Sequence, residues 1–206
     1  KLHFELNPKS ILSKNLGWHY IWRSSHIGGG IAASTIMTSD LMAMWWPDKV
    51  NVEEWYDWYF DWLNAHVSSR TGYWQRAFWN LVYKNPTLID MGGAVHFYWV
   101  YDAMNQPLAH PEKIIESTQS LQKSSGLYKQ NPFCIDLDGN FCIIRAFLQL
   151  PPSQQMTYRA SVHSSIEKNF EGVVRILNEQ SFEDIYTNLH LLPGALAALI
   201  ECAKLP

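Results

Sequence analysis

Apolar positions along the chain follow two kinds of helical pattern. In the first, apolar residues recur at steps of three and four, which predicts amphipathic helices with one buried face. These surface helices are expected at 51–67, 111–123 and 158–180. In the second, residues are apolar on nearly all sides, which indicates helices packed among other helices. These buried helices are expected at 27–46, 91–104, 140–150 and 191–203. The sequence therefore predicts an all-α chain in which buried and surface helices alternate.

A short motif of a polar residue, an aliphatic residue and glycine marks each predicted buried helix. The four motifs are HIGG from His26, DMGG from Asp90, DLDG from Asp136 and HLLPG from His190. They begin 64, 46 and 54 residues apart. Such periods are typical of repeat proteins in which one helical hairpin cannot bury its apolar face alone. We expect one domain over 1–206, with about three and a half hairpins in 26–206 and no assignment for 1–25.

A β-hairpin is the alternative for one of these segments. The stretch FCIDLDGNFCII, at 133–144, has Asp-Gly at its centre, a strong signal for a two-residue hairpin turn. Two of the other motif copies lead with Gly-Gly into helical, alanine-containing segments. The helical interpretation is therefore favoured for all four copies.

The stacked hairpins, with turns of glycine and an aromatic residue after the surface helices, resemble α/α-toroid repeat proteins. The squalene and terpenoid cyclases and the prenyltransferase β-subunits are the families concerned, and the resemblance covers about 26–203. It implies an α/α toroid, incomplete or truncated because the hairpins are fewer than in a full barrel. In such a toroid the inner helices run the same way, so His26, Asp90, Asp136 and His190 would surround one mouth.

The segment IDLDGN, at 135–140, resembles the Asp-x-Asp-Asp motif of class II terpenoid cyclases. The resemblance implies that Asp138 is the general acid, with Asp136 as the first aspartate and Asp90 as a further catalytic candidate. Gly139 and Asn140 depart from the motif. Burial would keep a carboxyl protonated near neutral pH by raising its pKa. The other interpretation is that these aspartates only cap helices, a role that aspartate favours.

Candidate ligand-binding residues are aromatic or ionisable. The segment HFYWVYD, at 96–102, places His96, Trp99 and Tyr101 on a buried helix, and such side chains suit a carbocation, a sugar ring or plain core packing. His96 and Asp102 each need a polar partner in such a helix, and each could pair with the other or with Tyr101. His26 and His190 are expected at the mouth. Arg145 is expected to neutralise Asp136 or Asp138, or to bind an anionic substrate.

We expect no cofactor, and the weaker alternative is that the protein binds zinc. Cys134, Asp136 and His190 are acceptable zinc ligands, and toroid relatives hold zinc at the starts of inner helices. The Cys-x-Asp order here reverses the Asp-x-Cys of the prenyltransferases. A buried free cysteine is the ordinary explanation.

Composition narrows the function classes. The chain has ten Trp, ten Tyr and nine Phe, a formal charge of −3 and only 16 Lys and Arg, which argues against nucleic acid as a partner. Three cysteines without paired spacing favour a reducing, cytoplasmic compartment. No apolar run is long enough for a transmembrane helix. An open barrel end would expose apolar surface to a partner domain or a second copy.

Three functions remain open from the sequence. The first is terpenoid-cyclase-like, acid-initiated chemistry on an apolar substrate in an aromatic cavity. The second is a carbohydrate-active α/α-barrel enzyme, a hydrolase or a lyase, with paired carboxylates. The third is a helical-repeat scaffold without catalysis.

Overall fold

The computed structural model describes residues 21–47, 51–74, 85–179 and 191–206, with side chains from Ser25 onward. Within these ranges every regular element is a helix, which confirms the all-α prediction. The helices are α3 (Ile21–Trp45), α4 (Val52–His66), α5 (Leu88–Ala103), α6 (Pro111–Leu121), α7 (Cys134–Gln149), α8 (Pro152–Glu179) and α10 (Leu192–Cys202). Because α7 covers nearly all of 133–144, the β-hairpin alternative is wrong.

Helices α3 and α5 pack closely and advance in the same direction. A Cβ added at Gly29 of α3 would lie 2.9 Å from the carbonyl oxygen of His96 in α5, so only glycine allows this approach. Further along both helices, Ile36 and Met104 line a common pocket.

Helices α7 and α10 run in the same direction as α5. Trp99 of α5 contacts Phe141 of α7, and one turn later Asp102 contacts Arg145. Gly194, near the start of α10, packs against the backbone of Cys134 at the start of α7. These four helices therefore advance together where they touch, as expected for the buried set.

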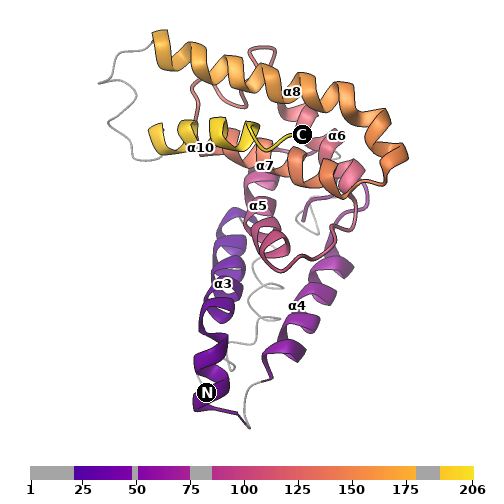
Figure 1. The fold of residues 1–206 in the computed structure, drawn as a ribbon, viewed down its shortest axis with the longest axis vertical. Coiled ribbons are helices and arrows are strands. Elements are labelled where there is room, and N and C mark those ends of the chain that lie inside the picture. Colours follow the sequence, from indigo (N-terminus) through magenta and orange to yellow (C-terminus); the bar gives the residue numbers. More distant parts are fainter. Residues whose placement is uncertain (1–20, 48–50, 75–84, 180–190) are drawn as a thin grey trace.

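Helix α8 runs antiparallel to α7. Its first turns lie at the end of α7, where Gln155 donates to the carbonyl of Leu150. Its later part lies near the start of α7, where the Asn169 amide donates to the Asp136 carboxylate. In Figure 1, α3 and α4 extend along the long axis of the molecule, and α8 and α10 cross its other end.

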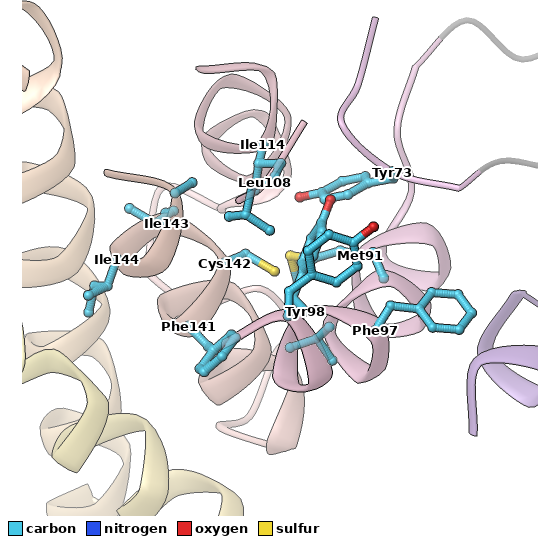
Figure 2. Packing of buried hydrophobic residues seen from close by; sticks show 14 of the residues in the cluster. Tyr73, Met91, Phe97, Tyr98, Leu108, Ile114, Phe141, Cys142, Ile143 and Ile144 are labelled. Atoms are coloured by element: carbon cyan, nitrogen blue, oxygen red, sulfur yellow. The ribbon is translucent and has the colours of Figure 1, made fainter. Parts of the chain in front are cut away.

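The hydrophobic core lies between α5, α6 and α7 (Figure 2). Tyr73, Tyr98, Ile114 and Cys142 meet there, and all four are buried. Some of the buried tyrosine hydroxyl groups are hydrogen-bonded: Tyr98 donates to the Gly72 carbonyl. Tyr59 and Tyr128 also bury their rings, but no hydrogen-bond partner of either hydroxyl group is observed in the described ranges.

Several helices begin earlier than the sequence pattern predicts. Helix α5 begins at Leu88, α7 at Cys134 and α8 at Pro152, rather than at 91, 140 and 158. Helix α3 begins at Ile21, so the HIGG motif lies inside this helix rather than before it. The DMGG and DLDG motifs occupy the first two turns of α5 and α7. No helix in the described ranges combines the length and apolar character needed to cross a bilayer.

Candidate functional site

Asp90 and Asp136 each cap the helix in which they lie. Asp90 accepts hydrogen bonds from the backbone N–H of Thr87 at 2.9 Å and from its hydroxyl at 2.8 Å. Thr87 in turn accepts from the Asp90 N–H, which completes a capping box. Asp136 accepts from the N–H of Phe133 at 2.9 Å in the equivalent position of α7. Both carboxylates therefore satisfy N–H groups that a helix start leaves unpaired.

Asp136 also anchors a buried polar network. It accepts hydrogen bonds from the N–H of Tyr128 at 3.1 Å and from the Asn169 amide at 2.9 Å. The Asn169 carbonyl oxygen accepts from Asn140, which also donates to the Ala198 carbonyl of α10 at 3.2 Å. The network joins α7, α8, α10 and the loop before α7. Burial raises the pKa of Asp136, and its three N–H donors oppose that rise.

Asp138 lies in a different environment. It is 4% exposed, and no hydrogen bond to its carboxyl is observed within the described ranges. Burial raises the pKa of Asp138 well above the usual 3.8, and the neighbouring charge of Asp136 adds to the rise. The spacing of three and seven residues places Asp138 on the same side of α7 as Phe141 and Arg145. A buried carboxyl with a raised pKa can hold a proton near neutral pH.

Five side chains form a continuous strip across three helices, and we call it the aromatic strip. Its members, in spatial order, are His26, His96, Trp99, Phe141 and Arg145. The His26 and His96 ring centroids lie 3.8 Å apart, and the His96 ring meets Trp99 edge-on at 5.3 Å. Trp99 meets Phe141 at 6.3 Å, and the Arg145 guanidinium lies 5.0 Å from the centre of the Phe141 ring. The strip thus brings together four of the predicted ligand-binding residues from α3, α5 and α7.

His96 is held in the neutral form within the strip. Its Nδ1 lies 3.0 Å from the Ser25 hydroxyl. Burial, with a smaller electrostatic contribution from His26, lowers the pKa of His96 to about 4. The hydrogen-bond partner at Nδ1 is therefore Ser25 of α3, and not Asp102 or Tyr101 as the sequence suggested.

Arg145 neutralises different carboxylates from those expected. Its Nε lies 3.0 Å from Asp102 of α5, and an Nη lies 3.5 Å from the buried Glu201 of α10. Asp136 and Asp138 lie about two turns earlier on α7, so the prediction that Arg145 neutralises either one is wrong. Arg145 instead ties α5, α7 and α10 together.

Two further candidates lie apart from the strip or outside the described ranges. Tyr101 is buried on the opposite side of α5 and donates to the Asn64 side chain of α4 at 2.8 Å. His190 lies outside the described residues. His26, Asp90 and Asp136 are each held by different partners: the His96 ring, Thr87, and the network around Asn169.

The predicted zinc ligands have other roles in the described part of the chain. Both carboxylate oxygens of Asp136 accept N–H hydrogen bonds. Burial raises the pKa of the Cys134 thiol to about 11, with a smaller contribution from Asp138. No group of three or more His, Cys, Asp or Glu side chains arranged for a metal ion occurs among the residues described.

Sequence reasoning missed several residues of this region. Asn140 and Asn169 join three helices, and a buried Asn on an otherwise apolar helix face is the signal that points to such a pair. Glu201 stands alone in an apolar helix, which signals a buried ion pair. Phe141 has no comparable signal, because nothing in the sequence distinguishes it from a core residue.

The chain was compared with protein-family models, with curated proteins and with solved structures, and none of them matches.

Proposed function

We propose that this chain is a helical-hairpin repeat protein of the α/α-toroid type that binds a small apolar ligand on the aromatic strip. The arrangement of the strip is the observation that carries the proposal. Trp99 is 41% exposed although it lies on a largely buried helix, and it meets the rings of His96 and Phe141. A row of ring faces and edges suits an uncharged ligand that stacks or packs against it.

Two observations favour an apolar ligand over a carbohydrate in an enzyme with paired carboxylates. A glycoside hydrolase needs a second carboxyl group that is free to act on water or on the sugar. Asp136, the nearest acid to Asp138 on α7, already accepts three N–H hydrogen bonds. Asp138 itself lies in a desolvated place, which suits apolar chemistry better.

Acid-initiated chemistry at Asp138 is a second candidate, favoured by the burial of that carboxyl. In this candidate the Asp138 O–H gives its proton to a ligand alkene, and the carbocation that forms is stabilised by the Trp99 and Phe141 rings. The carboxylate left behind recovers a proton when the cation loses one. Asp138 lies one helical turn from Phe141, which places the acid next to the strip.

Binding measurements test the main proposal. Farnesol and cellobiose serve as an apolar and a carbohydrate probe in calorimetry with the full chain. We expect farnesol to bind, and Trp99→Ala to weaken it by roughly threefold to tenfold, since one aromatic contact is lost. Trp62→Ala is the matched control, because Trp62 stacks on His66 of α4, away from the strip. Binding of cellobiose instead of farnesol would favour the carbohydrate alternative, and binding of neither would favour the scaffold.

Product analysis tests whether Asp138 acts as a general acid. Wild-type protein and Asp138→Asn are incubated with farnesol, and cyclic products are sought by gas chromatography. The candidate requires products from the wild type and none from Asp138→Asn, with binding retained in both. Products from the variant, or none from the wild type, contradict it.

We also propose that the exposed side of the C-terminal half of α3 is an association surface. Met37, Leu41, Met44 and Trp45 are 84%, 45%, 64% and 60% exposed. Their spacing places these side chains along one side of the C-terminal half of α3. A further helical repeat or a second copy of the chain would cover such a surface.

A further inference from the structure

A polar pocket lies between the C-terminal end of α6 and the middle of α8, away from the aromatic strip. Its volume is about 360 Å³. Serine, glutamine and lysine side chains line it, and its described lining contains neither a carboxylate nor an aromatic ring. The volume falls at the lower end of the range of about 300–1,000 Å³ that is usual for small-molecule sites. A pocket so polar suits a ligand with many hydrogen-bonding groups.

The charge of the pocket is positive. Lys123 and Lys168 both line it, and neither forms an ion pair with another described side chain. The C-terminal end of α6 contributes a partial negative charge of about half an elementary charge. Two full positive charges outweigh that contribution, so the pocket attracts an anionic group.

One hydrogen-bond donor among the residues that line this pocket lacks an acceptor in the described ranges. The Gln119 amide nitrogen is buried and finds no hydrogen-bond partner within the described ranges. A buried donor without an acceptor costs free energy, and a ligand oxygen would recover it. Gln122 holds the pocket in shape, because its amide donates to the carbonyls of Gly126 and Ser165, each at 2.8 Å.

We propose that this pocket binds a small phosphorylated polyol. The phosphoryl group lies between Lys123 and Lys168, and the hydroxyl groups of the polyol meet the Gln119 amide and the Ser164 hydroxyl. The same chemistry occurs in a soluble polyol phosphate and in the headgroup of a phosphoinositide lipid, so the test separates these two sources.

Calorimetry with the full chain provides the test, using inositol monophosphate, inositol and inorganic phosphate as separate probes. We expect inositol monophosphate to bind most tightly and its affinity to fall as salt is added. Lys123→Gln and Lys168→Gln should each weaken the affinity for inositol monophosphate by roughly tenfold, the usual effect of losing a charged hydrogen bond. Arg159→Gln is the matched control: it removes one positive charge from the exposed surface of α8 outside the pocket.

A second measurement locates the ligand and its source. Amide signals of residues 119–124 and 161–168 should shift on addition of inositol monophosphate in a two-dimensional NMR spectrum. Flotation with phosphatidylcholine vesicles, with and without phosphatidylinositol phosphate, reports the lipid form, and binding in either form supports the proposal. Absence of saturable binding in both forms overturns it. Equal affinities for inositol and inositol monophosphate, or equal losses in Arg159→Gln and the two lysine variants, also overturn it.

Discussion

Asp136 and Asp138 lie two residues apart on α7 and meet opposite environments. Asp136 accepts hydrogen bonds from Tyr128, Phe133 and Asn169, each through an N–H group. Asp138 is equally enclosed but receives none from the described residues, so its charged form is the more costly of the two. Burial therefore raises the pKa of both aspartates, and hydrogen bonds from N–H groups oppose that rise only at Asp136.

This difference predicts how stability depends on pH at Asp138. Its pKa in the folded chain is raised above the usual 3.8, so its contribution to stability is fully present below that pH and is lost as pH rises through the folded pKa. Asp138→Asn stays neutral and lacks this loss. Urea unfolding at a series of pH values from about 4 to about 8 should show the wild type losing stability relative to Asp138→Asn, by at most about 1.4 kcal/mol per pH unit. Parallel curves for the two proteins would mean that the Asp138 carboxyl titrates normally.

His96 provides a second prediction at the scale of a single residue. Burial and the neighbouring His26 lower the pKa of His96 from 6.5 to about 4. Its stabilising contribution is therefore present above pH 6.5 and is lost as pH falls toward 4. NMR titration of the imidazole signals should find His96 still neutral at about pH 5. His26→Ala should move the pKa of His96 upward, whereas His66→Ala, on α4, should leave it in place.

At the scale of helices, the sequence predicted the elements and the starts of α4, α6 and α10 to within one residue, but not the starts of α3, α5, α7 and α8. The apolar pattern identified the helices because each helix buries a face or a stripe. The starts of α5 and α7 were missed because the helices are capped at Thr87 and Phe133, about one turn before the aspartates that begin the motifs. Apolar periodicity shows which residues share one side of a helix, but it does not show where the helix begins.

Contacts between helices were the part that the sequence could not supply. Arg145 pairs with Glu201, which lies far along the chain, and not with the aspartates of its own helix. His26 meets His96 because α3 packs against α5, and Trp99 meets Phe141 because α5 packs against α7. Which faces of different helices meet depends on packing that a single sequence does not display.

Adjacent glycines in α3 test the close packing of α3 on α5. A Cβ at Gly29 would lie 2.9 Å from the His96 carbonyl oxygen, whereas one at Gly30 would meet nothing within 4 Å. Gly29→Ala should therefore destabilise the chain by about 1–3 kcal/mol, because the helices must move apart. Gly30→Ala should stabilise it by about 0.5–1 kcal/mol through helix propensity. Urea denaturation measures both, and stabilisation by both substitutions would contradict the close approach.

At the scale of the whole molecule, helices α10 and α3 differ in how they pack. Helix α10 packs against α7 and α8, and Arg145 and Lys204 flank the carboxylate of Glu201 there. Helix α3 packs against α5 mainly through its N-terminal half, around Ser25 and Gly29. Its C-terminal half extends along the long axis beside α4 (Figure 1) and exposes large apolar side chains. Within the described ranges, that half of α3 is therefore a surface that a partner could cover.

Association through this part of α3 can be measured directly. Large apolar side chains that lie together on a helix surface are costly in water, and a second copy of the chain that covered them would recover that free energy. Over roughly a hundredfold range of concentration, the sedimentation coefficient of the wild type should rise, because association follows mass action. The double variant Leu41→Glu, Met44→Glu should sediment as a monomer throughout, since its carboxylates would have to be buried at the interface. Met156→Glu, an equally apolar-to-acidic change at an exposed position of α8, should leave association unchanged. If the wild type also remains a monomer at every concentration, α3 does not bind a second copy of this chain.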